Sequence, residues 1–312
     1  MPRIATFAHP IARMASCACA CVIGLALSTL PIRANADTGI SVIDDSGRTV
    51  TLNAPAHRIV SLAPSTTELL FAAGAGRYVV GTSSYSDYPP EATQIAQVGD
   101  AAMINMERIV SLKPDLIIVW SHVDSAAVLE KLQVLGIPVY YSEPRRIADI
   151  AKSIIDMGTL AGTTTEATRV ADQLSGRIGA LRRKYAGRPP IRVFYQVWER
   201  PLMTINGQQM ISDAIELCGG VNIFGGLAAT VPTVNREAVV AANPDVIVTY
   251  DGETEDALSG WKTLTTMHAT AWGNLVALST PALGRPSPRF LEGAENLCIE
   301  FDRARARRPA AK

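Results

Sequence analysis

The most constraining feature of this 312-residue chain is a segment that occurs twice, about 130 residues apart. Residues 105–118 read NMERIVSLKPDLII and residues 235–248 read NREAVVAANPDVIV. Asn, Glu, Pro and Asp keep the same spacing in both copies, and an aliphatic run follows each Pro-Asp pair. Solenoid repeats have periods of about 20 to 50 residues, so this longer period indicates two lobes of one plan. Each lobe would contain a short helix, a Pro that ends it and a buried strand, and two similar lobes predict a cleft between them.

The N-terminal 36 residues have the composition of a secretory signal. They combine positive charge at Arg3 and Arg13, an apolar stretch over 17–32 and a small-residue ending at 34–36, which predicts cleavage before Asp37. The alternative is a membrane anchor, but the apolar stretch is shorter than the roughly 20 residues that a spanning helix needs. We therefore expect export followed by cleavage.

Removal of the signal changes both the charge and the cysteine count. The signal carries three Arg residues and no acidic residue, which leaves 26 basic and 29 acidic side chains and a net charge of about −3. This charge does not favour nucleic acid as a partner. Only Cys218 and Cys298 remain of the five cysteines. In an oxidising compartment an even pair favours one disulfide, the alternative being two separate buried thiols.

The rest of the chain alternates between strand and helix patterns, which is typical of an α/β fold. A hairpin is predicted over 40–52 and a buried strand over 58–62. A helix then begins at Pro64, where Ser65 and Glu68 have the spacing of a capping box. Further strands are predicted at 79–81, 116–120, 137–141 and 190–195.

The longest helical pattern covers 163–187 and lies between the two copies of the repeat. It has no Pro, so it predicts a rigid connecting helix rather than a flexible linker. The predicted fold is therefore two Rossmann-like lobes, with parallel-rich sheets flanked by helices, at 37–162 and 188–302. A ligand cleft is expected between them. The basic run 303–312 is expected to be a frayed tail.

The two glutamates of the repeat occupy matched positions. Asn105 and Asn235 are good N-cap residues, so Glu107 and Glu237 fall in the first helical turn, where the helix dipole favours an acid. That role suffices for either glutamate alone. In two lobes of similar fold, however, the acids would lie at equivalent points and offer a symmetric pair of charges to a two-fold symmetric basic partner.

Aromatic residues gather in the loops that follow predicted strands, where ligands bind in open α/β sheets. The chain has 18 Phe, Trp and Tyr residues, and five of them lie in four such loops: Tyr85, Tyr88, Trp120, Trp198 and Tyr250. Flat aromatic faces suit a large planar ligand. Each of these residues taken singly could equally cap the core of a sheet.

Motifs of enzymatic chemistry are absent from the sequence. It has no GxSxG, HExxH, P-loop or GxGxxG pattern, and its histidines are isolated. His122 follows Trp120 at a predicted strand end and could ligate a metal centre. An ordinary loop histidine is the simpler interpretation. We therefore predict a binding protein without a resident cofactor rather than an enzyme.

Several segments together resemble one family, the exported substrate-binding proteins of ABC importers for vitamin B12, haem and ferric siderophores. They are the strand and helix at 58–68, the loop 83–90, the segment 105–120 and the segments 206–224 and 285–289. The resemblance covers nearly all of the mature chain and is greatest to the B12-binding subgroup. It implies a periplasmic protein, monomeric when free, that captures a corrinoid such as cobalamin. Its implied partners are a permease dimer and the ATPase of the importer.

The resemblance also implies roles for individual residues. Glu107 and Glu237 would dock onto arginines of the two permease subunits, and Cys218 and Cys298 would form a disulfide. The implied ligand contacts are Tyr85, Trp120 and Arg285.

The aromatic wall expected of the B12-binding subgroup is incomplete in this chain. Ala101 and Val231 stand where that subgroup has tryptophans, and Met203 stands where it has a contacting Phe. Trp198 could compensate from the neighbouring loop, so Trp198 and Met203 complete the predicted ligand contacts. Haem is therefore the alternative ligand, with Tyr85 or His122 as its axial ligand.

A different class of protein, a bilobal metal chelatase, is a remote alternative. It would require His and carboxylate groups that converge in the cleft, whereas the histidines of this chain are isolated.

Overall fold

The computed structural model describes residues 39–100, 103–120, 132, 134, 136–250, 257–278 and 281–309, all within one compact unit, Gly39–Lys312. The predicted signal at 1–36, Ala101 and the candidate metal ligand His122 lie outside the described residues. Among the helices that are described, none is both long and apolar enough to cross a membrane.

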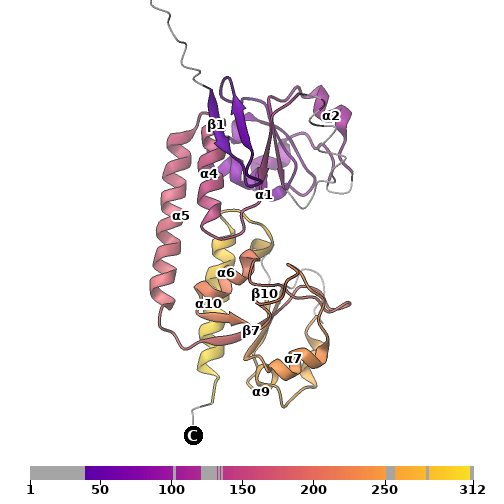
Figure 1. The fold of residues 1–312 in the computed structure, drawn as a ribbon, viewed down its shortest axis with the longest axis vertical. Helices are drawn as coiled ribbons and strands as arrows, with labels where there is room; N and C mark the ends of the chain where they lie inside the picture. The colour runs from indigo at the N-terminus through magenta and orange to yellow at the C-terminus, as the bar shows by residue number, and fades with distance from the viewer. Residues whose placement is uncertain are drawn as a thin grey trace, which may run out of the picture. The chain divides into compact units, whose positions relative to one another are not determined.

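A four-stranded parallel sheet forms the centre of the N-terminal lobe (Figure 1). Its strands are β3 (Ile59–Ser61), β4 (Val79–Thr82), β5 (Leu116–Trp120) and β6 (Val139–Ser142), in the order β4-β3-β5-β6. The helices of this lobe are α1 (Pro64–Ala72), η1 (Gly76–Tyr78), η2 (Pro90–Gln94), α2 (Met106–Ser111) and α4 (Asp149–Leu160). The predicted hairpin is confirmed as the antiparallel pair β1 (Ile40–Ile43) and β2 (Thr49–Leu52).

The C-terminal lobe repeats this topology. Its strands are β7 (Ile191–Gln196), β8 (Gly220–Asn222), β9 (Val246–Tyr250) and β10 (Leu275–Leu278), and they form a parallel sheet of order β10-β9-β7-β8. Its helices are α6 (Met210–Leu217), α7 (Arg236–Ala242), α8 (Ser259–Lys262), α9 (His268–Ala271), η3 (Pro281–Gly284) and α10 (Phe290–Ala306). In both lobes the first strand of the sheet lies between the second and third, which confirms two lobes of one plan.

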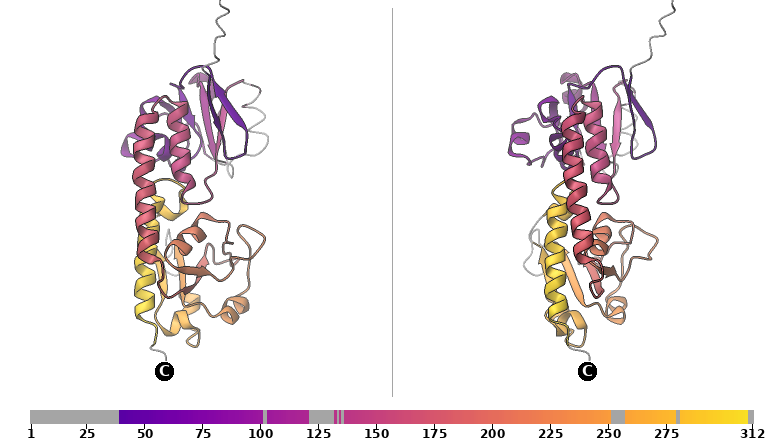
Figure 2. Two further views of the ribbon diagram at one scale, coloured as in Figure 1. Left: turned by 60° about the vertical axis from the view of Figure 1, so that its left-hand side comes forward. Right: turned by 90° about the vertical axis from the view of Figure 1, so that its left-hand side faces the viewer.

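The two sheets are connected by α5 (Thr164–Tyr185), which falls within the range predicted for a rigid helix. Figure 2 shows α5 beside α4 and α10, and Arg177 of α5 forms an ion pair with Glu295 of α10 at 3.0 Å. One hydrophobic cluster includes buried side chains of α1, α4, α5, α6 and α10, so it is continuous from one lobe to the other. The α/β fold with parallel sheets flanked by helices is therefore confirmed.

Two local predictions differ from the structure. Ser65 and Glu68 form no capping box, because α1 begins at Pro64 after Ala63, whose side chain has no acceptor. Residues 303–309 are also not a frayed tail. α10 continues to Ala306, and Arg305 donates a 2.6 Å hydrogen bond to the carbonyl oxygen of Cys218. The arginines of this run are therefore held by partners in the C-terminal lobe.

Candidate functional site

A cleft of about 570 Å³ lies between loops of the two lobes. The N-terminal lobe contributes Trp120, at the end of β5, and residues 143–145, which follow β6. The C-terminal lobe contributes residues 208–211, the pair Thr230 and Val231, and part of the stretch 283–290. The cleft thus lies beyond the carboxyl ends of β5 and β6, as the rule for open α/β sheets predicts. Its volume is typical of a small-molecule site, for which about 300–1,000 Å³ is usual.

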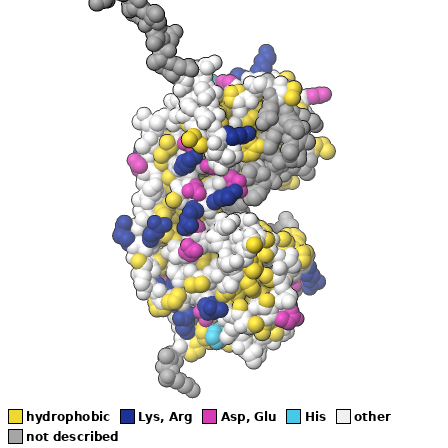
Figure 3. Space-filling model, viewed as in Figure 1, with side chains coloured by type: hydrophobic (Ala, Val, Ile, Leu, Met, Phe, Trp, Pro, Cys, Tyr) yellow, Lys and Arg dark blue, Asp and Glu magenta, His cyan; other side chains and the backbone are white. Residues whose placement is uncertain are grey.

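The lining of the cleft is largely apolar, and its charged side chains balance one another. Its charged side chains among the described residues are Glu143 and Arg145, which form an ion pair at 3.4 Å. Gln208, Gln209 and Thr230 supply uncharged donors and acceptors from the opposite lobe. Figure 3 shows basic and acidic side chains interspersed across the middle of one face of the molecule. The site is therefore suited to a ligand that combines an apolar surface with neutral polar groups.

The N-terminal hairpin positions the cleft loop that carries Glu143. A carboxylate oxygen of Asp45, in the hairpin turn, accepts a 2.7 Å hydrogen bond from the backbone N–H of Glu143. Burial raises the pKa of Asp45, whereas this hydrogen bond and the ammonium of Lys152 oppose the increase. The sequence analysis missed this contact, because Asp45 and Glu143 are 98 residues apart.

The five predicted ligand contacts differ in where they lie relative to the cleft. Trp120 is half-buried and lines the cleft. The side chain of Tyr85 is 76% exposed, and Trp198 is 62% exposed with its indole N–H donated to the carbonyl oxygen of Arg200. Met203 is half-buried and forms isolated bridges with Trp198 and Thr233. Of the five, only Trp120 is among the described residues that line the cleft; the fifth, Arg285, is bonded elsewhere.

Arg285 is bonded within the protein rather than directed to the cleft lining. Its guanidinium contacts a carboxylate oxygen of Glu68 at 3.2 Å and one of Asp87 at 2.5 Å. The hydrogen bond from Arg285 lowers the pKa of Asp87, so this carboxyl stays ionised at neutral pH. The charge of Arg285 is therefore balanced by two acids of the N-terminal lobe.

The two glutamates of the repeat are exposed, as the sequence predicts. The side chain of Asn105 accepts a 2.9 Å hydrogen bond from Arg108 N–H, and that of Asn235 accepts a 2.8 Å bond from Ala238 N–H, so both N-caps are confirmed. Glu107 and Glu237 lie in the first turns of α2 and α7. Within the described part of the chain, neither carboxylate has an ion-pair partner.

Residues 59–279 match the family model described as periplasmic binding protein. The chain belongs to this family. It is a family of binding proteins rather than enzymes, which disfavours the chelatase alternative.

Individual members of the family are similar over most of the chain. The vitamin B12-binding protein of Yersinia pestis (strain Pestoides F) is 37% identical over 248 residues, which cover 79% of this chain and 86% of that protein. The structure of the periplasmic vitamin B12 binding protein BtuF of Vibrio cholerae has a TM-score of 0.73 and 36% identity, covering 80% and 98% of the two chains. The periplasmic heme-binding protein RhuT of Roseiflexus sp. RS-1, in apo form, has a TM-score of 0.70 and 27% identity, covering 80% and 98%.

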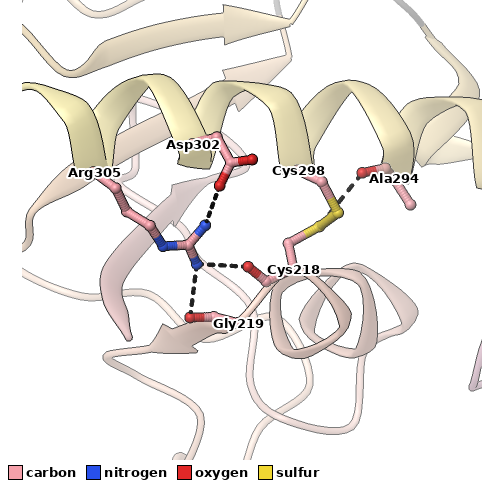
Figure 4. The surroundings of a disulfide bond; sticks show 6 residues. All are labelled: Cys218, Gly219, Ala294, Cys298, Asp302 and Arg305. Atoms are coloured by element: carbon pink, nitrogen blue, oxygen red, sulfur yellow. Dashed lines mark hydrogen bonds and ion pairs between the residues drawn. A yellow bond between two sulfur atoms is a disulfide. The ribbon is translucent and has the colours of Figure 1, made fainter. Parts of the chain in front are cut away.

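The disulfide of this periplasmic binding protein is present as predicted. Cys218 ends α6 and Cys298 lies in α10, with a Cα–Cα distance of 4.8 Å (Figure 4). Arg305 reinforces the same junction through the carbonyl oxygens of Cys218 and Gly219. Because Met210 in α6 and Phe290 in α10 both line the cleft, the disulfide links two elements of its wall.

Proposed function

We propose that this periplasmic binding protein captures a corrinoid, such as cobalamin, in the cleft and delivers it to an ABC importer. The observation that carries the choice of ligand is the charge balance of the cleft lining, where the N-terminal lobe contributes the Glu143–Arg145 ion pair and the C-terminal lobe the uncharged groups of Gln208, Gln209 and Thr230. Corrinoids bear amide side chains around the ring, and amides pair well with such donors and acceptors. The similarity to vitamin B12-binding proteins over most of the chain supports the same ligand class.

Haem is the competing ligand, since RhuT is also similar to this chain. Haem carries two propionate carboxylates, which favour unpaired cations in the site. Among the described residues that line the cleft, the cationic side chain is that of Arg145, and its charge is neutralised by an ion pair with Glu143. The nearby Arg285 is neutralised by Glu68 and Asp87. This charge pattern favours the neutral amide periphery of a corrinoid over the anionic edge of haem.

The proposal assigns a part to each predicted residue. Trp120 would lie against the corrin ring, and the exposed loops that carry Tyr85 and Trp198, with Met203 beside them, would contribute further contacts. Glu107 and Glu237 would dock on the two subunits of the permease, whose ATPase drives import. The region 1–36 would direct export to the periplasm, where the lobes 37–162 and 188–302, joined by 163–187, would act as a free monomer.

Titration of the mature protein with ligands tests the choice of cargo. We expect calorimetry to show binding of cyanocobalamin or cobinamide and weaker binding of haem, with haem also followed by its absorbance spectrum. Trp120→Ala should weaken corrinoid binding about tenfold, because an aromatic contact with a ring contributes about 1 kcal/mol or more beyond its burial. Trp272→Ala removes a tryptophan that stacks on His268 in α9 and serves as the matched control. Haem binding without any corrinoid response would overturn the proposal.

A further inference from the structure

Glu68 of the N-terminal lobe holds three side chains of the C-terminal lobe. Its side chain is only 2% exposed. One carboxylate oxygen accepts hydrogen bonds from Arg285, at 3.2 Å, and from Arg289. The other accepts from the hydroxyl of Ser287, at 2.6 Å, and from Nε of Arg289, at 3.0 Å. A single buried carboxylate thus joins α1 to a segment more than 200 residues away.

The residues that Glu68 holds are interleaved with residues that line the cleft. The cleft-lining members of the stretch 283–290 are Leu283, Gly284, Pro286 and Phe290. The members bonded to Glu68 are Arg285, Ser287 and Arg289. One side of the stretch therefore forms a wall of the cleft, while the other side is fixed to the opposite lobe.

Two neighbours of Glu68 strengthen the same junction. Asp87 forms a second ion pair with Arg285, and its side chain is 63% exposed. The guanidinium of Arg289 lies 4.0 Å from the ring centroid of Tyr88, which is within the range of a cation–π contact. Because Glu68 is buried and accepts four hydrogen bonds, its contribution should exceed that of the exposed Asp87.

We propose that Glu68 is a positioning residue for the ligand cleft. It does not line the cleft itself, but it sets the position of the wall formed by residues 283–290 through Arg285, Ser287 and Arg289. Ligand affinity then depends on a carboxylate of the lobe opposite to that wall. The dependence of the wall on Glu68 stands independently of the ligand, whereas its effect on affinity rests on the proposed function.

Hydrogen exchange of the ligand-free mature protein tests the first part. In Glu68→Gln the carboxylate charge is removed with little change in volume, so Arg289 loses its ion-pair partner and Arg285 keeps only Asp87. We expect amide exchange over 282–290 to increase about tenfold while exchange in β7 is unchanged. Glu295→Gln is the matched control, because it breaks the ion pair of Arg177 between α5 and α10 without touching the wall. Unchanged exchange over 282–290 in Glu68→Gln would overturn the proposal.

Corrinoid binding by the same variants tests the second part. We expect Glu68→Gln to weaken binding about tenfold, mainly through faster dissociation, and Glu295→Gln to leave it unchanged. Glu68→Asp keeps the charge and should restore part of the affinity. A variant with a lower Tm but wild-type affinity, measured well below unfolding, would show a purely structural role and refute the proposal. If the wild-type protein binds no corrinoid, the proposed function fails, and the exchange measurement alone decides whether Glu68 positions the wall.

Discussion

The two copies of the repeat build the same local structure in the two lobes, but they are held in place differently. In each copy the Asp after Pro accepts a hydrogen bond from the backbone N–H at the start of the first strand, Asp115 from Arg58 and Asp245 from Arg192. The residue before each Pro-Asp pair, Lys113 or Asn243, has a positive φ of 47° or 45°. Equal spacing in the sequence therefore specifies an equal helix–turn–strand unit.

The difference between the copies lies in what surrounds the aspartates. Asp115 is exposed, and its described side-chain bonds go to the backbone N–H groups of His57 and Arg58. Asp245 is 5% exposed and also accepts a 2.7 Å hydrogen bond from Arg308, which follows α10. The C-terminal end of the chain thus secures the second copy. A repeated motif can share its local geometry while its stability depends on elements outside it.

The largest expected effect concerns the exposed glutamates, which the two copies have in common. Glu107→Arg combined with Glu237→Arg should abolish uptake, because both proposed contacts with a basic permease become repulsive. Ligand affinity should stay within about twofold, as for most surface substitutions. Uptake of labelled cobalamin by a reconstituted importer, together with calorimetry, measures the two effects.

The control for this pair is Glu91→Arg, which reverses an exposed glutamate in the first turn of η2. The single variants sharpen the comparison, since unequal losses of uptake would mean that the two lobes dock unequally. A large loss of ligand affinity in the double variant would contradict the separation of docking from binding.

The next largest expected effect is that of removing the disulfide. Because this bond lies in the C-terminal lobe, its removal should affect the two lobes unequally. Replacing Cys218 and Cys298 by Ala should lower the free energy of unfolding by about 4 kcal/mol, since the bond closes a loop with a sequence separation of 80 residues. Urea unfolding measures the total loss of unfolding free energy, and hydrogen exchange shows which segments lose protection. Protection should fall in α6 and α10 and persist in β3 and β5. An equal fall in both lobes would show that the disulfide stabilises the unit as a whole.

The two aspartates should differ in their contribution to stability. Asp245→Ala removes the buried acceptor of the Arg192 N–H and the ion-pair partner of Arg308, which keeps the carbonyl oxygen of Pro190 as an acceptor. This should cost about 2 kcal/mol of unfolding free energy. Asp115→Ala exposes its backbone partners to water and should cost about 1 kcal/mol. Urea unfolding of the two variants provides the test. Equal losses of unfolding free energy in the two variants would contradict the proposed difference between the copies. If the contact with Arg308 causes the larger loss, Arg308→Ala should reproduce part of the loss seen in Asp245→Ala.

The smallest expected effects are those of the two N-caps, where the copies should be alike. Asn105→Ala and Asn235→Ala should each cost about 1 kcal/mol, because each removes one hydrogen bond to an orphan N–H of a helix. Asn53→Ala, at an exposed asparagine outside any helix, is the control and should be neutral. Thermal unfolding is sensitive enough for the comparison. A marked difference between the two caps would mean that α2 and α7 depend on their surroundings to different degrees.

Most elements of the fold could be predicted because their signals are local. The aliphatic runs identify strands such as β5 and β9, since parallel strands are buried on both faces. The Pro-free periodic pattern identifies α5 with ends that differ from the prediction by one or two residues. The pairing of Cys218 with Cys298 followed from cysteine number and compartment as well as from the resemblance.

The candidate site was predicted less completely, because its contacts are long-range. Glu68 has the local spacing of a capping residue, yet its partners lie 217 to 221 residues further along the chain. Arg285 was predicted to contact the ligand, and only its ion pairs with Glu68 and Asp87 reveal another use of its charge. The hydrogen bond from Glu143 to Asp45 has no signal in the local sequence at all.

The sequence by itself determined that this protein has two lobes of one plan, a rigid connection and a matched pair of exposed acids. Helix capping, strand burial and spacing are properties of neighbouring residues, and they can be read along the chain. Only the tertiary structure decided that Trp120, among the five predicted ligand contacts, lies in the described lining of the cleft and that Glu68 is bonded to the opposite wall. Burial and ion pairing depend on which distant segments meet, and that is settled by packing of the whole unit.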